Sequence, residues 1–320
     1  MIPGQLANAT LHKERDTLDF RKESFEIVYH YYTDNTTGQR FTVDEIDHLN
    51  LTQVYNQYRS KHGIPFVDEI KSIREQYGLS ASKMSDVLGL GTNVYRNYEL
   101  GEIPSPSVGR LIQLAKNPEK FMDLLELSKN DLSVNEVDKI YKKLESKLNT
   151  RNDDEELIKK RVPGEQGPSS LNGYRQADIE RIGQMASFFS IEMKPNKTKL
   201  DKLFFLADFI HYSRSGFGVS GFAYESVCRH PSPKYAGYIY DCLFSKSYID
   251  VTIIDAGAVE VEQYISHLPK PAEEKFEASE FRAMQDALSF SARFNTDKFD
   301  GGRHKSAIDY TSAFYIDFNT

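Results

Sequence analysis

The chain has 320 residues, more than one ordinary domain usually holds, so we expect two or three compact units joined by linkers. Hydrophobic residues make up 39% and charged residues 27%, and no apolar run approaches the roughly 20 residues of a membrane helix, which excludes a membrane protein. The two cysteines and a start without a secretion-signal pattern indicate the cytoplasm, and the net charge of -7 argues against nucleic-acid binding unless basic side chains gather on one face.

The first segment predicts a β-hairpin followed by a helix. Residues 22–42 contain an aromatic and β-branched run, then the turn-rich segment DNTTG, then a short return. Thr42 and Glu45 form a capping box, which predicts that a helix begins here and continues until shortly before Pro65. We therefore assign residues 1–65 to an N-terminal hairpin and helix.

Helix-stopping residues are dense in the next segment. Five short helices fit within residues 66–130, separated by glycine, proline and asparagine, and this pattern describes a compact helical bundle. An apolar stripe over residues 134–148 predicts one more helix. Residues 150–173 are charged and rich in Pro, Gly and Ser, so we assign residues 131–174 to a connecting helix and linker.

The last segment, residues 175–320, is predicted to be a second, mostly helical domain. The helices are expected at about 177–190, 196–213, 232–246 and 278–294, with two strands between 248 and 265. Ser232 is the expected cap of the third helix.

Residues 79–105 carry the most informative pattern. Their apolar positions describe two short helices broken by Gly89-Leu90-Gly91, which is the packing of a helix-turn-helix. This arrangement turns the open face of the second helix toward base edges in the major groove, while the first helix contacts the DNA backbone. The whole chain is thus predicted to be mainly α: an N-terminal β-hairpin plus helix-turn-helix bundle, a linker, and an α-helical domain with a small β-hairpin.

Polar residues of the two helices are the candidate DNA contacts. Arginine can pair bidentately with guanine and asparagine with adenine, whereas hydroxyl and ammonium groups suit phosphates. The expected base contacts are Thr92, Asn93, Arg96 and Asn97, and the expected phosphate contacts are Ser80, Ser82 and Lys83. The alternative for each side chain is an ordinary solvated helix face.

The segment resembles the Cro/repressor helix-turn-helix family through the pattern L-S-x-x-x-[LM]-[AS]-x-x-L-G followed by [WY]-E-x-G. The matching residues are Leu79, Ser80, Met84, Ser85, Leu88, Gly89, Tyr98, Glu99 and Gly101. The resemblance implies that Arg74 and Glu99 form a structural ion pair and do not contact DNA. Gly91 departs from the pattern, because a serine usually caps the second helix there.

The charge of this segment favours a rival interpretation. Residues 67–128 hold seven Lys and Arg against nine Asp and Glu. An acidic domain binds DNA weakly as a single copy, which suggests either a homodimer or a protein-interaction adaptor or phage-related regulator whose helix-turn-helix no longer reads DNA.

The N-terminal hairpin, helix and helix-turn-helix together are similar to the MqsA-type antitoxins, which join a zinc-binding piece to such a motif. That family carries two C-x-x-C pairs before the hairpin, whereas this chain has no cysteine before Cys228. No H-E-x-x-H pattern is present either. We therefore expect no metal site and no cofactor.

The second domain also carries a family pattern, a K-L-x-K-L-[LF] helix before a G-x-x-Y segment and a proline-rich turn. The matching residues are Lys199, Leu200, Lys202, Leu203, Phe204, Asp208, Gly221, Tyr224, Pro231, Pro233 and Tyr235. Residues 175–295 thereby resemble the Panacea or SocA-like antitoxin domain, although His230 and Ser232 stand where Gly and Val are usual. The resemblance implies neutralisation of a toxin protein by direct binding.

Aromatic residues near loops and prolines of this domain are candidate partner contacts, because aromatic side chains dominate interface hot spots. The predicted set is Phe217, Phe222, Tyr224, Lys234 and Tyr235, and the alternative for each aromatic is burial in the core.

Several potentially catalytic side chains also lie close together in this part of the sequence, namely Asp201, Asp208, His211, Cys228 and His230. No nucleophile elbow or phosphate-binding glycine loop accompanies them, so we predict no catalytic residue and no enzyme. The complete hypothesis is a cytoplasmic type II antitoxin: a homodimer that represses its operon at a palindromic double-stranded operator and binds a cognate toxin.

Overall fold

The computed structural model describes residues 6–129, 132–149, 167–227, 230–255, 260–268, 275–292, 306–316 and 318. The chain is mainly α, as predicted, and forms two compact units. One is the helical unit, Tyr55–Glu156, and the other, the larger unit, combines Met1–Val54 with Leu157–Thr320. The predicted division into four successive segments had separated the N-terminal hairpin from the C-terminal domain, whereas both belong to the larger unit. Most of the predicted linker lies outside the described residues.

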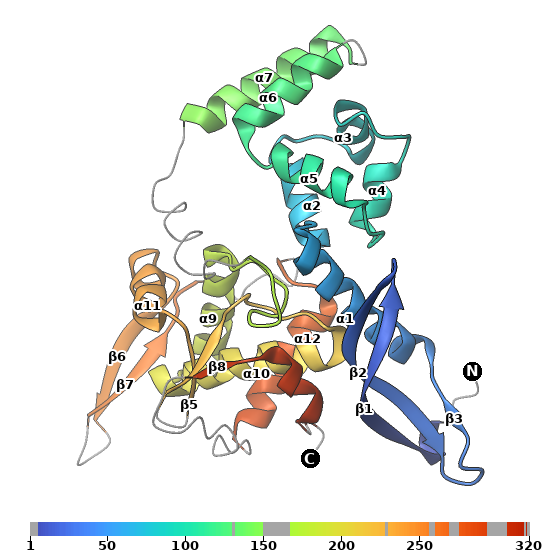
Figure 1. Cartoon of the computed structure of the whole chain (residues 1–320). Helices are drawn as coiled ribbons and strands as arrows, with labels where there is room; N and C mark the ends of the chain where they lie inside the picture. The colour runs from blue at the N-terminus through green and yellow to red at the C-terminus, as the bar shows by residue number, and fades with distance from the viewer. Residues whose placement is uncertain are drawn as a thin grey trace. The chain divides into compact units, whose positions relative to one another are not determined.

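The helical unit contains the five short helices that the sequence predicted, followed by a longer one (Figure 1). They are α2 (Val67–Glu75), α3 (Ala81–Val87), α4 (Val94–Glu99), α5 (Pro106–Ala115), α6 (Pro118–Ser128) and α7 (Val134–Asn149). The side chains of Ser80, Ser105 and Asn117 accept backbone N–H groups and so begin three of these helices. The core packs Ile70, Met84, Tyr95, Ile112 and Phe121 together.

The N-terminal β-structure is larger than predicted. The strands are β1 (Ala9–Phe20), β2 (Glu23–Asp34) and β3 (Arg40–Phe41), and a short 3-10 helix η1 (Leu6–Asn8) precedes them. The predicted pairing of β2 with β3 is present, but the prediction missed β1, which pairs with β2 along its whole length. The charged β1 is mostly exposed and lacks an apolar alternation. Its turn uses Arg21 and Lys22 at positive φ where Asn-Gly is usual, so no sequence signal marked it.

Helix α1 (Asp44–His62) leads from the larger unit into the helical unit. Its side-chain amides satisfy the backbone of β2: Gln53 both accepts from and donates to Val28, and Asn50 does the same with His30, at 2.8 to 2.9 Å. These four buried bonds fix the helix against the strand.

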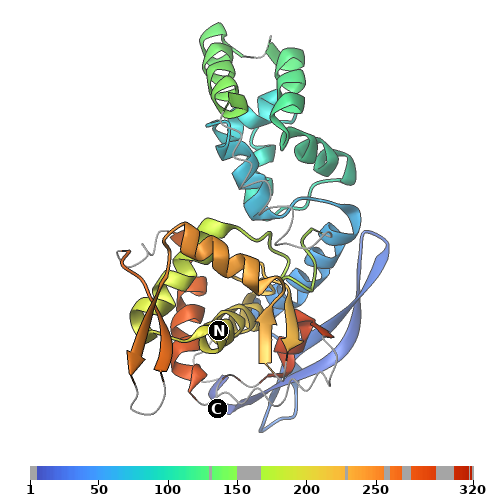
Figure 2. The ribbon, with the colours of Figure 1, turned by 90° about the vertical axis from the view of Figure 1, so that its left-hand side faces the viewer.

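The rest of the larger unit is built around one buried helix. α10 (Lys197–Ser215) lies at the centre, flanked by α9 (Ile179–Met193), α12 (Ala278–Ser291) and the 3-10 helix η5 (Tyr310–Tyr315) (Figures 1 and 2). A three-stranded sheet has the order β5 (His230–Pro233), β4 (Tyr224–Val227), β8 (Ser306–Ile308). α11 (Ala236–Ser245) and the hairpin of β6 (Asp250–Asp255) with β7 (Glu260–Ile265) complete it.

The predicted helices corresponding to α9, α10 and α12 are confirmed, as is the β6–β7 hairpin, whose turn lies outside the described residues. The helix predicted at about 232–246 is present as α11, but it begins at Ala236, and the prediction that it starts in the segment around Ser232 was wrong. That segment is the edge strand β5, where prolines are tolerated because no ladder hydrogen bond is needed on the open side. The hydroxyl of Ser232 donates to Asp201 at 2.9 Å and caps nothing. Among the described helices, none combines the length and apolarity needed to cross a membrane.

Candidate nucleic-acid interface

Helices α3 and α4 form the two arms of the motif, and the glycine turn between them has the required backbone. Gly89 follows α3 with φ of +62°, a conformation that glycine adopts without steric cost. Asn93, at the cap position of α4, also has positive φ, at 64°, and its side chain makes no cap hydrogen bond. The start of α4 therefore needs a cap from elsewhere.

Ser85 supplies that cap. Its buried hydroxyl on α3 accepts the backbone N–H of Tyr95 in the first turn of α4, at 3.1 Å. The cap position of α4 is thus Asn93 and not Gly91 as expected, and a serine on the preceding helix supplies the acceptor that Asn93 does not. Because the bond joins the two helices, it also fixes the direction in which α4 leaves the turn.

Two contacts on the inner side of α4 hold it against the core, one buried and one partly buried. The side chain of Tyr95 is fully buried, and its hydroxyl donates to the carbonyl of Ile70 on α2 at 2.7 Å. Burial raises the pKa of Tyr95 well above its usual value, so the phenol remains a donor. The ion pair expected from the family resemblance is confirmed, since Arg74 Nε lies 2.6 Å from Glu99 Oε1 and Arg74 Nη1 donates to Leu79 O at 2.8 Å.

The four predicted base contacts lie on α4 or directly before it: Arg96 and Asn97 belong to the helix, and Thr92 and Asn93 precede its first residue. Thr92, Asn93, Arg96 and Asn97 are exposed, while Tyr95 and Tyr98 point into the core. Within the described part of the chain, no hydrogen bond or ion pair engages these four side chains. Their donors and acceptors are therefore available to a ligand, as base contacts require.

The predicted phosphate contacts line the start of α3. Ser82 is exposed, and Lys83 is half-buried with its ammonium 3.5 Å from Asp86. Ser80 accepts the backbone N–H of Lys83 at 3.2 Å, which leaves its own hydroxyl proton to donate. Each residue can thus donate to a phosphate oxygen without breaking the fold.

Two of the five predicted partner contacts of the larger unit are buried in its core. Phe222 and Tyr224 are each only 1% exposed, so the expectation that they are surface anchors was wrong. Both belong to the aromatic core around α10, where Tyr224 donates to Asp208 at 2.6 Å. Phe217 is half-buried.

Lys234 and Tyr235 are accessible to a partner, Lys234 partly and Tyr235 more fully. Tyr235 is 49% exposed, and the ammonium of Lys234 lies 5.2 Å from the centroid of its ring. Tyr235 has a φ of 62°, which is uncommon for an aromatic residue and positions it just before α11.

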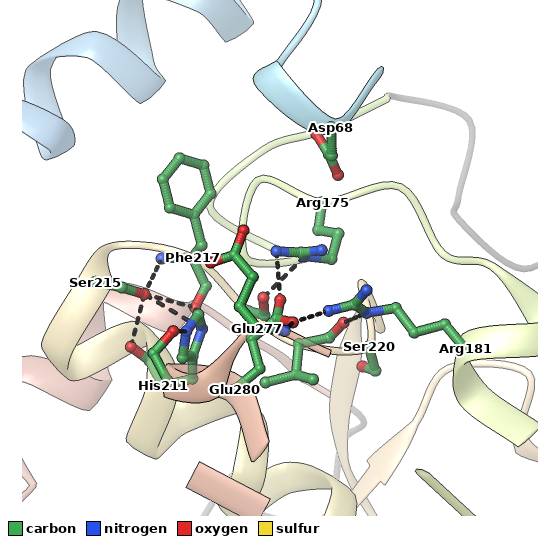
Figure 3. Close-up of polar contacts among 12 residues, drawn as sticks. Asp68, Arg175, Arg181, His211, Ser215, Phe217, Ser220, Glu277 and Glu280 are labelled. Atoms are coloured by element: carbon green, nitrogen blue, oxygen red, sulfur yellow. Dashed lines mark hydrogen bonds and ion pairs between the residues drawn. The ribbon is translucent and has the colours of Figure 1, made fainter. Parts of the chain in front are cut away.

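The potentially catalytic side chains of this unit are engaged in structural contacts. His211 Nδ1 donates to the carbonyl of Phe217 at 2.7 Å (Figure 3). Its Nε2 lies 3.2 Å from Ser279 Oγ. Burial lowers the pKa of His211 to about 4, so the imidazole is neutral at pH 7. Asp201 accepts from Tyr240 and Ser232.

The other three potentially catalytic side chains differ in their surroundings. Asp208 is fully buried among its donors, His230 is exposed on β5, and Cys228 lies outside the described residues.

A buried ion-pair cluster beside His211 escaped the sequence analysis. Glu280 is 1% exposed and pairs with Arg175 at 2.8 Å and with Arg181 (Figure 3). Burial alone would raise the pKa of Glu280, but the two guanidinium groups outweigh it and leave the pKa lowered. The partners are about a hundred residues apart, so no local pattern could have revealed them.

Comparison with known proteins agrees with the geometry of α3 and α4. Residues 70–119 match the helix-turn-helix family model HTH_3, and this segment is a helix-turn-helix domain of the Cro/C1 type. The domain belongs to a class that binds DNA in transcriptional regulators. No curated protein and no solved structure matches the chain.

Proposed function

We propose that the chain is the antitoxin of a type II toxin-antitoxin system: a cytoplasmic homodimer that represses its own operon at a palindromic operator and neutralises a cognate toxin. The observation that carries the regulatory part is the exposure of Arg96 and Asn97 on α4, and of Asn93 at its cap, on a helix held in place by Ser85 and Tyr95. A rigid support for exposed readout residues keeps the ordering cost of binding low.

We propose a homodimer because the helix-turn-helix segment is acidic and one copy would bind DNA weakly. Residues 67–128 have two more acidic than basic side chains, so one copy attracts phosphates weakly. Two copies double the contacts and match a palindrome whose half-sites lie about one helical turn apart. Toxin binding falls to the larger unit, with Lys234 and Tyr235 as the contacts that remain accessible. We propose no catalytic role, because His211 and Asp208 already have internal partners.

The test of DNA reading is a binding titration on the duplex immediately upstream of the coding sequence, with random duplex as competitor. Arg96→Ala is expected to lower the affinity for the upstream duplex by about 1 to 3 kcal/mol, or roughly 5- to 150-fold, and to leave the melting temperature unchanged. Lys120→Ala is the control, because Lys120 is an exposed cation on α6, outside the motif. Equal affinities of wild type and Arg96→Ala would contradict the proposal.

The test of toxin neutralisation is co-expression with the product of the adjacent reading frame. The wild-type chain should restore growth fully, and Tyr235→Ala should restore it less well. Tyr315→Ala is the matched control, since Tyr315 is also a largely exposed tyrosine of the larger unit. If wild type, Tyr235→Ala and Tyr315→Ala all restored growth, Tyr235 would not be a toxin contact. If the product of the adjacent reading frame were not toxic, the antitoxin proposal would be wrong.

The acidic balance of the helical unit favours one second candidate, an adaptor whose helix-turn-helix no longer reads DNA. The two functions differ in the upstream titration, because an adaptor would not distinguish the upstream duplex from random DNA.

A further inference from the structure

An open pocket of about 260 Å³ lies within the helical unit, between the α2–α3 turn, the start of α3 and α7. Three lysines from two helices line it, Lys83 on α3 and Lys139 and Lys143 on α7, together with the hydroxyl of Ser80. Lys139 and Lys143 are four positions apart and so lie on one face of α7, beside the buried Ile140 that joins the helix to the core.

The α2–α3 turn is shaped to admit the ammonium of Lys143. Gly78 has a φ of +66°, and a Cβ added there would lie 2.4 Å from Lys143 Nζ. Any other residue would displace the ammonium from the turn. Lys143 and Ser80, two residues beyond Gly78 along the chain, line the same pocket.

Lys139 and Lys143 are two exposed cations of α7. In the described part of the chain, neither Lys139 nor Lys143 forms an ion pair, and both side chains are exposed. Lys83 shares its charge with Asp86. Converging ammonium groups beside a hydroxyl donor fit an anion with several acceptor oxygens, and a phosphate group has that chemistry.

We propose that Lys139 and Lys143, with Ser80 and Lys83, bind a phosphate of the DNA backbone, so that α7 is part of the DNA interface. This inference rests on the proposed function, because α3 is the helix of the motif that contacts the backbone. It also explains how an acidic domain meets a polyanion: α7 places two cations beside the three residues of α3 already assigned to phosphates. A free phosphate or nucleotide offers the same chemistry and is the alternative source of the group.

The experiment is a salt titration of DNA binding by the full chain, with the upstream duplex and a random duplex as separate probes. Lys143→Gln and Lys139→Gln are compared with Lys142→Gln, which removes an exposed cation from the same helix but outside the pocket. The first two variants should lower the affinity for both duplexes by the same factor, on the order of 10-fold, and reduce the slope of log affinity against log salt by about 0.9. Lys142→Gln should keep the wild-type affinity and slope.

Each other outcome overturns the proposal in a distinguishable way. If Lys143→Gln and Lys139→Gln bind both duplexes as Lys142→Gln does, the phosphate site is wrong while the regulator stands. If wild type binds neither duplex, the phosphate site and the proposed regulator fail together. If inorganic phosphate shifts amide NMR signals of the pocket in wild type but not in Lys143→Gln, and DNA affinity is unchanged, the pocket serves a free phosphate.

Discussion

The helical unit and the larger unit treat their polar residues in opposite ways. On α4 of the helical unit, Arg96 and Asn97 are exposed and have no internal partner in the described chain. On α10 of the larger unit, Asp208 and His211 are buried and bonded on every side that the described residues show. Both helices are rich in potentially functional side chains, yet only one of them offers those side chains to a ligand.

A cluster of reactive residue types indicates chemistry only where the fold leaves the hydrogen-bonding groups of those residues without protein partners. A buried carboxyl or imidazole survives because protein donors and acceptors replace water. Once those partners are in place, the group stabilises the fold and is poorly placed to act on a substrate. Exposed polar residues on a rigid support, by contrast, are open to a ligand.

The largest effect is expected from removal of the fully buried Asp208. Asp208 accepts from Val219 N, Ser220 N, Ser220 Oγ and Tyr224 OH at 2.5 to 2.7 Å. Asp208→Ala leaves these buried donors unpaired, so we expect the free energy of unfolding to fall by about 3 to 5 kcal/mol. Urea denaturation measures it. The exposed Asp241→Ala on α11 is the control and should change stability by less than about 0.5 kcal/mol.

A mild effect of Asp208→Ala, close to that of Asp241→Ala, would mean that the carboxyl is not structural. The proposal that this unit has no catalytic role would then need a new argument.

The second test uses pH. Burial lowers the pKa of His211 and of His30 to about 4, while an unfolded histidine titrates near 6.5. Between these values the unfolded chain binds more protons than the folded one, so the free energy of unfolding falls as the pH falls from about 6.5 to about 4. Each histidine contributes on the order of 3 kcal/mol to this loss.

Urea midpoints between about pH 7 and pH 4.5 check the profile. His211→Gln should flatten it, whereas His48→Gln, at an exposed position of α1, should leave it unchanged. If His211→Gln lost as much stability as wild type between these pH values, the assignment of a neutral buried His211 would be wrong.

Sequence reasoning succeeded where a short-range pattern determines the structure. The helix-turn-helix, its Arg74–Glu99 pair and the exposed face of α4 all follow from residues within about thirty positions of one another. It failed where the determining partner is distant or unmarked. Strand β1 gains its conformation from β2 through an Arg-Lys turn, and Phe222 and Tyr224 are buried because α10 and η5 cover them. A local sequence pattern distinguishes an exposed aromatic from a buried one only weakly.

The smallest expected effect gives the sharpest test, because two serines on α3 separate stability from binding. Ser85 is buried and caps α4, whereas Ser82 is exposed and has no partner in the described chain. Ser85→Ala should lower the free energy of unfolding by about 1 to 2 kcal/mol, because the N–H of Tyr95 loses its acceptor. Ser82→Ala should leave stability unchanged and weaken binding to upstream and random duplex alike, since a phosphate contact carries no sequence information.

Thermal unfolding and DNA titration of the same two variants measure both quantities. If Ser82→Ala destabilised the chain as much as Ser85→Ala, the exposed side of α3 would have a structural role, and the distinction between the two units would no longer hold.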